Sequence, residues 1–336
     1  MFPRAVWERE GRVVARVLAL DIGGTKLAAA VVDTTGQVAG FVERPTPVTA
    51  DSAGLFACVQ ATLATALQAA GASLSDLRGI GVGCGGPMGY PEGRVSPLNI
   101  PAWRDFPLRE RLAASYGLPV WVDNDAKALA LGEYWQGAGR GARALLGMVV
   151  STGVGGGLVL EGQLVHGARG NAGHIGHVIV RPNGPRCGCG ARGCLEAIAA
   201  GPSLARAAAR ALRRGVPSGL QGCAPLTGQA VAAAARAGDP LAIGLLADAG
   251  RAVGRVLASA AALLDLDRVV IGGGVSQAGA LVFEPLRGEL ARRARLAFTR
   301  ELTVVPAQLG RQAGVVGAAA LFFQATHLAS LGSPTP

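Results

Sequence analysis

Residues 17–44 read VLALDIGGTKLAAAVVDTTGQVAGFVER: an apolar strand, a glycine-containing turn, a second apolar strand, and a hairpin that leads into GQVAG. The same plan returns at residues 144–167, which read ALLGMVVSTGVGGGLVLEGQLVHG. This repeat of strand, glycine turn, strand, hairpin and strand recurs after about 130 residues. It predicts two related α/β domains that face one another, each with one glycine turn.

Composition excludes several classes of protein. The 336 residues are 50% hydrophobic and 16% charged, and 51 of them are glycine. A disordered chain, a collagen and a coiled coil are excluded, and the length accommodates two domains. No apolar run is long enough to span a membrane. Because the first sixteen residues are mixed and charged rather than an apolar signal core, we expect a cytoplasmic protein without a membrane partner.

The net charge of +10 raises the question of nucleic acid. Its distribution argues against that partner, because the arginines are scattered and their densest groups, at 206–214 and 292–300, fall on alanine-rich helical stretches. These groups are typical of solvated helix faces. Of the six cysteines, three lie between residues 187 and 194, which indicates a metal site rather than a disulfide framework.

The rest of the chain alternates between helical and strand patterns, which indicates the α/β class. Helices are predicted at residues 55–70, 108–116, 126–135, 202–214, 228–237, 240–264 and 314–326, strands at 79–86, 119–125 and 268–276, and a loose tail at 328–336.

Three glycine turns follow apolar strands. Asp21 with Gly23, Gly24 and Thr25 is a phosphate-loop candidate, although it lacks the spacing of a P-loop or a dinucleotide fingerprint and a plain hairpin is the alternative. The turn at 151–157 strengthens the candidate, because two such turns on opposed domains can hold one polyphosphate. The turn at 271–276 could lie against an adenine or ribose, with an ordinary strand-to-helix turn as the alternative.

Six motifs together resemble the ROK family of repressors, uncharacterised open reading frames and sugar kinases, within the actin, hexokinase and Hsp70 superfamily. They are DIGGTK (21–26), VDNDA (122–126), STGVGGGL (151–158), GNAGHIGH (170–177), CGCGARGCLE (187–196) and IGGGVS (271–276), and the resemblance extends over residues 17–328. It implies an α/β fold of two ribonuclease H-like (actin-like ATPase) domains with an interdomain cleft. We expect a small domain at 1–125, joined by a C-terminal helix at 314–328, and a large domain at 126–313.

Asp125 ends an apolar strand and precedes a helix, where a carboxylate can accept the proton of a sugar hydroxyl during phosphoryl transfer. It resembles the catalytic base of the family, while Asn124 and Asn99 resemble sugar ligands. Helix capping is the alternative for Asn124 or Asp125 taken alone. The resemblance also implies ATP with Mg²⁺, Asp21 positioning the ion through water. The residues expected to contact the nucleotide are Asp21, Gly23, Gly24, Thr25, Lys26, Thr152, Gly153, Gly155, Gly156, Gly273 and Gly274.

Cys187, Cys189 and Cys194, with His177 ten residues before the first of them, supply three thiolates and one imidazole. This is a closed tetrahedral set for structural Zn²⁺, and three buried free cysteines are the alternative. Anchoring His177 and Glu196 would fix the loop that meets the sugar. We expect both residues to be sugar ligands as well.

One position departs from the family pattern. Sugar-kinase members read AGExGH, whereas this chain has His174 in place of the glutamate. An imidazole offers one donor and one acceptor where a carboxylate only accepts. Two interpretations stay open: His174 is an alternative sugar ligand, or it marks a loss or change of kinase activity. Glu196 matches the second sugar-binding carboxylate of the family and favours the first.

The leading hypothesis is an ATP-dependent hexose kinase of the glucokinase type, acting in glycolysis on glucose to give glucose 6-phosphate, and forming a homodimer or homotetramer. Kinases of N-acetylglucosamine or N-acetylmannosamine are the nearest rivals. A sugar-responsive regulator is the rival of another class, but only about sixteen residues precede the first strand, too few for the helix-turn-helix domain of such regulators. Polyphosphate as phosphoryl donor is a third hypothesis.

Overall fold

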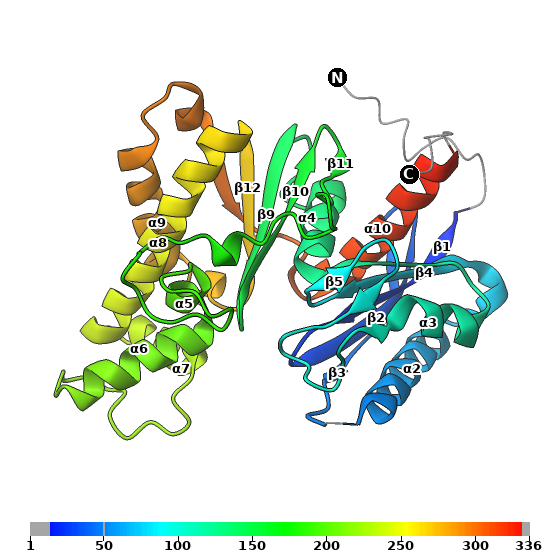
Figure 1. Cartoon of the computed structure of the whole chain (residues 1–336), viewed down its shortest axis with the longest axis horizontal. Coiled ribbons are helices and arrows are strands. Elements are labelled where there is room, and N and C mark those ends of the chain that lie inside the picture. The colour runs from blue at the N-terminus through cyan, green and yellow to red at the C-terminus, as the bar shows by residue number, and fades with distance from the viewer. Residues whose placement is uncertain (1–13, 50, 331–336) are drawn as a thin grey trace. The chain divides into compact units, whose positions relative to one another are not determined.

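Each copy of the repeat in the sequence supplies three antiparallel strands of a five-stranded sheet, and the two sheets share one topology. The strands lie in the two parts of the chain drawn in Figure 1. The first sheet has the strand order β3 (Val38–Pro45), β2 (Lys26–Asp33), β1 (Arg16–Ile22), β4 (Leu77–Cys84) and β8 (Val120–Asn124). The second has the order β11 (Gln163–Leu164), β10 (Val154–Leu160), β9 (Ala144–Val150), β12 (Arg268–Gly272) and β13 (Thr303–Pro306). In each sheet the first three strands pair antiparallel and the rest pair parallel.

The computed structural model describes residues 14–49 and 51–330, so the start of the chain and residues 331–336 of the expected loose tail lie outside the described residues. The chain divides into two compact units. The first unit contains residues up to Arg140, the segment His166–Ala172 and the residues from Gln308 onward. The second contains Gly141–Val165 and Gly173–Ala307.

This division differs from the boundary expected between residues 125 and 126. Helix α4 (Asp125–Gln136) belongs with the first unit, because it packs along the C-terminal helix α10 (Ala313–Ser330). Gly132 in α4 faces Gly317 in α10 so closely that a Cβ on Gly132 would lie 2.8 Å from the Gly317 nitrogen. The two helices therefore approach each other through residues without side chains, a contact that strand and helix patterns do not reveal.

Helices cover both faces of the first sheet. Leu18, Leu20 and Ile22 of β1 share one core with helices α2 (Ser52–Ala69) and α3 (Leu108–Tyr116). Successive strand residues point to opposite faces, so α10, which also packs on β1 and β4, covers the other face. Gly79 and Gly81 in β4 permit that contact, since a Cβ on either would collide with Phe322 or with the Ala318 carbonyl of α10. The short strands β5 (Met88–Gly89), β6 (Arg94–Val95) and β7 (Phe106–Pro107) form a third sheet, which the sequence patterns did not predict.

The second unit has its own core, built largely from helices on its sheet. These helices are α5 (Glu196–Ala199), α6 (Gly201–Arg213), α7 (Gly228–Arg236), α8 (Pro240–Leu264) and α9 (Ala280–Arg293). Helices α8 and α9 lie side by side in Figure 1, and Gly250 and Gly254 on α8 face backbone atoms of α9. Two separate cores account for the division into two units.

One described helix, α2, reaches the length and hydropathy that a membrane span needs, and α7 with α8 does so only as a pair bent by 114°. Helix α2 buries Leu55, Phe56, Val59, Leu63 and Ala66, and it packs on β2 and β3. Such contacts are typical of a core helix in a folded domain.

Glu133 in α4 is a fully buried carboxylate whose partners are backbone amides. Its oxygens accept hydrogen bonds from the N–H groups of Ala138 (2.8 Å), Gln308 (3.0 Å) and Leu309 (2.9 Å). Ala138 lies just before Arg140, where the chain leaves the first unit, and Gln308 and Leu309 are the residues at which it finally returns. Glu133 therefore ties both segments to α4.

We expect Glu133→Gln to lower the free energy of unfolding by roughly 3 kcal/mol, because the NH₂ group of the new side chain would face backbone N–H groups and leave buried donors without an acceptor. Glu161→Gln is the control, since Glu161 forms an exposed pair with Arg143 and should cost less than about 1 kcal/mol. Urea unfolding of the two variants measures the difference. Equal costs would contradict the anchoring role of Glu133.

Candidate functional site

In the first unit, the expected nucleotide and sugar residues gather at the carboxyl ends of parallel strands. Asp21 in β1 pairs in register with Gly83 in β4, and Gly83 pairs with Asp123 in β8, directly before Asn124 and Asp125. A Cβ on Gly83 would lie 3.8 Å from the Asp21 carboxylate and 3.5 Å from the Cα of Asp125. The two acidic residues thus approach each other across a glycine.

The Asp21 carboxyl is unusual in its protonation. Desolvation by the surrounding protein, followed by the charge of Asp125, raises its pKa to about 7, while Lys26 opposes the shift. Gly314, at the start of α10, leaves room for this carboxyl, because a Cβ there would collide with it. The charge of Asp125 acts on the Asp21 carboxyl, and a cation beside both would relieve this repulsion; carboxylate oxygens are ligands that Mg²⁺ prefers.

Asn124 and Asp125 lie at the start of α4. Asn124 is the N-cap, and its Oδ1 accepts a hydrogen bond from the Ala126 N–H at 3.1 Å. The capping alternative therefore holds for Asn124, but it uses only the acceptor end of the amide. The Asp125 carboxylate lies in the first helical turn, beside the N–H groups that begin the helix.

The first glycine turn closes the β1–β2 hairpin by a hydrogen bond from the Gly23 N–H to the Lys26 carbonyl. Gly24 has a specific steric role, since a Cβ there would lie 2.5 Å from the Cβ of Asn99. Asn99 is exposed and lies against this turn. Lys26, expected at the phosphates, pairs with Glu43 at 2.9 Å in this structure.

In the second unit, the other two glycine turns are neighbours, because β9 and β12 are adjacent parallel strands. The Val275 N–H bonds the Val150 carbonyl, and a Cβ on Gly274 would lie 3.7 Å from the Ser151 hydroxyl. Gly273 has φ +95° and a backbone so close to Val150 that only glycine fits. Exposed Thr152 and part-buried Gly153 lie in the turn, whereas Gly155 and Gly156 belong to β10.

The stretch Gly173–His177 packs on β10. Gly173 has φ +93°, and Cβ atoms on Gly173 or Gly176 would collide with the backbone of Gly156 or Val154. His174 precedes the short helix η2 (Ile175–His177), and its ring centroid lies 6.2 Å from that of His177. The glycines of β10 and of this stretch are thus explained by close backbone packing.

Glu196 begins α5 and reaches the second glycine turn. Its Oε2 accepts a hydrogen bond from the Val154 N–H at 2.9 Å, and a Cβ on Gly153 would lie 2.8 Å from the same oxygen. Its Oε1 lies 3.9 Å from the Cys187 sulfur. Glu196 therefore connects the turn to the cysteine motif.

His177, Cys187, Cys189 and Cys194 offer four ligand atoms that all lie within 4.8 Å of one another. The Cys187 sulfur lies 3.7 Å from His177 Nδ1, and the Cys189 and Cys194 sulfurs are 3.7 Å apart. A tetrahedral Zn²⁺ with bonds of about 2.3 Å to sulfur places its ligand atoms roughly 3.8 Å from each other. The four residues predicted from the sequence therefore fit this ion in number, chemistry and spacing.

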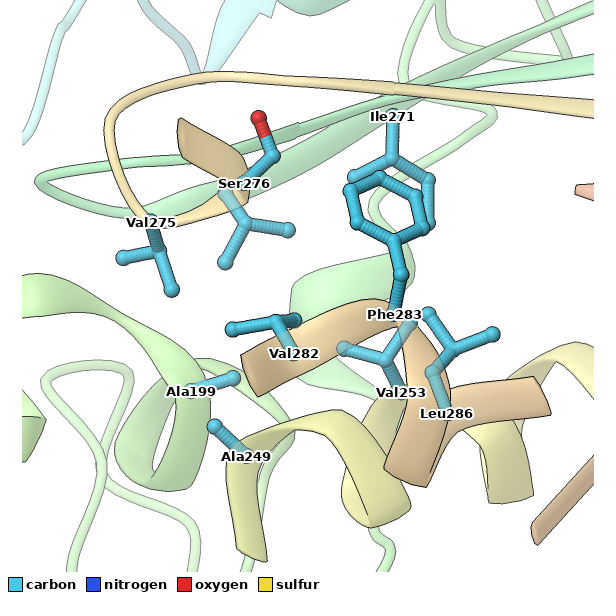
Figure 2. A pocket seen from close by; sticks show the side chains of 10 residues that line it. Ala199, Ala249, Val253, Ile271, Val275, Ser276, Val282, Phe283 and Leu286 are labelled. Atoms are coloured by element: carbon cyan, nitrogen blue, oxygen red, sulfur yellow. The ribbon is translucent and has the colours of Figure 1, made fainter. Parts of the chain in front are cut away.

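A cavity beneath the third glycine turn is lined by Ile271, Val275 and Ser276 together with side chains of α8 and α9 (Figure 2). Its volume is about 10 Å³, which is room for no more than one water molecule. Aliphatic and aromatic groups make up nearly all of its lining. It is a packing void of the core and no ligand site.

Sequence reasoning overlooked a buried charged cluster beside Asp125. Asp123 and Lys127 have fully buried side chains, and Lys127 Nζ lies 3.2 Å from Asp123 Oδ1. Asp123 Oδ2 lies 2.8 Å from Nδ1 of His166. The sequence carried a signal, because Asp123 and Lys127 have opposite charges and are four residues apart between a predicted apolar strand and a predicted helix.

Comparison with known proteins identifies the family of the chain. Residues 17–325 match the ROK family. A glucokinase of Halalkalibacterium halodurans is 37% identical over 324 residues, covering 94% of this chain and 97% of its own. An N-acetylmannosamine kinase of Citrobacter koseri is 37% identical over 311 residues, covering 90% and 97%.

Solved structures extend the comparison. A ROK family glucokinase from Streptomyces griseus in complex with glucose and AMPPNP is 36% identical, with a TM-score of 0.79 over 91% of this chain and 99% of that chain. A ROK family transcriptional regulator, a homologue of the E. coli MLC protein, is 26% identical, with a TM-score of 0.82 over 94% of this chain and 79% of that chain. The expected α/β fold of the actin-like ATPase type is confirmed.

The pKa of Asp21 predicts a pH-dependent stability. The pKa is near 3.8 in the unfolded chain and about 7 in the folded protein. Well below pH 4 the group is protonated in both states. Between about pH 4 and pH 7 the unfolded chain loses this proton while the folded protein keeps it, so the unfolded state is increasingly favoured, and the penalty levels off above about pH 7. Asp21→Asn removes this penalty, so the variant should be more stable than the parent by roughly 2–4 kcal/mol near pH 8.5 and by much less near pH 5.

Urea unfolding of the protein without nucleotide or metal at both pH values measures this effect. Asp239→Asn is the control. Hydrogen bonds from backbone amides, first that of Ala242, lower the pKa of Asp239, so removing this carboxylate should bring no gain in unfolding free energy at alkaline pH. An equal gain for Asp21→Asn at both pH values would show that desolvation of the carboxylate is not its cause.

Proposed function

The chain belongs to the ROK family, and on that premise we propose that it is an ATP-dependent sugar kinase that phosphorylates the 6-hydroxyl of a hexose, with glucose as the first candidate. The observation that carries the proposal is the approach of Asp21 and Asp125 across Gly83, at the carboxyl ends of parallel strands. Ligands of open α/β sheets bind at such ends. We further propose that the protein acts in the cytoplasm, in glycolysis, as a homodimer or homotetramer.

Asp125 is the proposed catalytic base. Transfer of the phosphoryl group to a hydroxyl needs a carboxylate that accepts the hydroxyl proton as the new P–O bond forms. Asp125 lies in the first turn of α4, and its Oδ1 accepts a hydrogen bond from the Ala126 N–H at 2.8 Å, which holds the carboxyl group in place. Asn124 caps the helix through Oδ1, which leaves its amide N–H groups to donate to a sugar oxygen.

The glycine turns are the proposed phosphate and adenosine contacts. In the first unit, Gly23, Gly24 and Thr25 offer backbone and hydroxyl groups beside Asp21. In the second, Thr152 and Gly153 lie next to Gly273 and Gly274. Mg²⁺ would be held near Asp21, directly or through water, and would supply positive charge to the transferring phosphoryl group.

The remaining sugar contacts are proposed from Asn99, His174, His177 and Glu196. One oxygen of Glu196 is engaged by the Val154 N–H, so the other is the candidate acceptor. His177 and the three cysteines would hold Zn²⁺, which gives His177 a fixed ring orientation. The ion has a structural role in this proposal, since four protein ligands leave no open position.

Two rival functions have specific support. The similarity to N-acetylmannosamine kinases equals that to glucokinases in identity, and His174 changes the donor and acceptor pattern offered to the sugar. The sugar-responsive regulator is favoured by the TM-score of 0.82, but the match covers only 79% of that regulator against 97% of the glucokinase. Asp125 and the glycine turns support the enzyme. Polyphosphate is the alternative phosphoryl donor, and the assay below tests it beside ATP.

The kinase proposal predicts ADP release from Mg-ATP with one sugar of a panel that contains glucose, mannose, N-acetylglucosamine and N-acetylmannosamine. Asp125→Asn should lower kcat by about 10²–10⁴-fold, because the base is lost while the shape of the side chain is kept. Asp105→Asn is the control, since Asp105 is exposed, pairs with Arg94, and has a φ of +49° that asparagine also adopts. Silence across the panel with ATP and polyphosphate, or full activity of Asp125→Asn, would exclude the proposed mechanism.

The zinc proposal predicts one equivalent of zinc in the purified protein by elemental analysis. Cys189→Ser should lose the metal, lower Tm by several degrees and raise the KM for the sugar, because the loop that carries His177 is no longer fixed. Cys223→Ser, which changes an exposed cysteine outside the cluster, should keep the metal and the KM. A protein that retains zinc after Cys189→Ser would refute this ligand set.

A further inference from the structure

The cluster of Asp123, Lys127 and His166 takes no part in the proposed chemistry, yet it buries two charged side chains completely. Burial lowers the pKa of Lys127, and the charge of Asp123 opposes that shift. A buried ammonium is costly unless hydrogen-bonded partners compensate for its lost hydration. The identity of these partners therefore indicates what Lys127 does.

The ammonium of Lys127 has partners on two segments of the first unit. It pairs with Asp123 Oδ1 at 3.2 Å, and it donates to the carbonyl oxygens of Gly170 at 2.7 Å and His166 at 3.4 Å. Three N–H groups thus meet one carboxylate and two carbonyls. Both carbonyls belong to the segment His166–Ala172, which is far from α4 in sequence.

The same segment has further attachments around this ammonium. Nδ1 of His166 lies 2.8 Å from Asp123 Oδ2, and the ring stacks on Tyr90 with centroids 4.4 Å apart. The Asn171 side-chain amide donates to the Met88 carbonyl at 3.3 Å. Gly170 has φ +73°, and a Cβ there would collide with Tyr90. The segment is held between β5 and the start of α4, and Lys127 is its charged attachment.

Two connections link this segment to the proposed site, one through space by way of Asp123 and one along the chain. Asp123 Oδ1 also accepts a hydrogen bond from the Asn124 N–H at 2.7 Å, directly before Asp125. At the other end, Ala172 continues into Gly173–His177, which carries the proposed sugar ligands His174 and His177. Beyond His177 the chain is fixed by the cysteine cluster. The sugar-binding stretch is therefore anchored after its end by cysteines and before its start by Lys127.

We propose that Lys127 is a positioning residue for sugar binding: its buried ammonium fixes the backbone of His166–Ala172 through the Gly170 and His166 carbonyls, and so orients the sugar-binding stretch that follows. The inference rests on the proposed function. Lys127 acts on the sugar through this segment and does not touch the reacting groups.

Lys127→Met, which keeps the length of the side chain and removes its donors, tests the role by two measurements. Hydrogen exchange of the amides in His166–Ala172, such as the Ala172 N–H that bonds the His166 carbonyl at 2.9 Å, should become faster, whereas that of strand β9 should not change. The KM for the sugar should rise by about tenfold with kcat and the KM for ATP nearly unchanged. Arg143→Met is the control, because it removes an exposed ion pair and should alter neither measurement.

A second variant separates positioning from stability. Lys127→Met leaves the Asp123 carboxylate without its ammonium, and adding Asp123→Asn removes that buried charge. The double variant should regain part of the lost unfolding free energy while its KM for the sugar stays high, since the carbonyls of Gly170 and His166 still lack their donor. Recovery of the KM together with stability would reduce Lys127 to a structural role and overturn the proposal.

The remaining outcomes are also decisive. Unchanged exchange in His166–Ala172 would refute the attachment itself, and faster exchange with an unchanged KM would refute its role in sugar binding. If the parent protein phosphorylates no sugar of the panel, the proposed function falls, and the positioning role falls with it. The exchange measurement then still decides whether Lys127 fixes the segment, so the two failures are distinguishable.

Discussion

The buried charges of Asp123 and of helix α4 are the constraint on which the first unit depends. A charged group without exposure must be matched by fixed partners, and here the partners are mostly backbone groups of distant segments. Glu133 binds the amides of Ala138, Gln308 and Leu309, while Lys127 binds the carbonyls of His166 and Gly170. These segments are the places where the chain enters or leaves the first unit. Since α4 is fixed by all of them, Asp125 at its start has a defined position.

The glycine residues are the second constraint on the structure. They matter mainly because they let neighbouring segments approach closely, and less because of the turn geometry they allow. Gly83 lets Asp21 and Asp125 approach each other, and the missing side chain of Gly24 leaves room for that of Asn99. Gly273 lies on Val150 and brings two glycine turns of the second unit together. In both units these contacts occur at the carboxyl ends of parallel strands, where ligands of such sheets bind. One topology, used twice, therefore yields two such sheet edges with different side chains.

Substrate choice depends on a smaller set of residues than the fold does. Kinases of glucose and of N-acetylmannosamine match this chain equally well in identity, so the shared scaffold does not separate the two sugars. In the proposed function the difference lies in the stretch Gly173–His177, whose glycines pack on β10 while the imidazole of His174 offers a donor and an acceptor. The four metal-ligand candidates include His177 at the end of this stretch, and Lys127 binds the segment His166–Ala172 that precedes it in the chain.

The sequence by itself determined the α/β class, the paired sheets, most helices and the four clustered metal-ligand candidates, because these follow from periodicity, repetition and spacing along the chain. Tertiary structure alone assigned α4 to the first unit, through the approach of Gly132 to Gly317, and showed Lys26 paired with Glu43. It alone also revealed Glu133, Lys127 and His166 as anchors. Their partners lie between 4 and 176 positions away along the chain, and several are backbone atoms. A backbone carbonyl or amide carries no sequence signal, so such contacts exist only once the chain has folded.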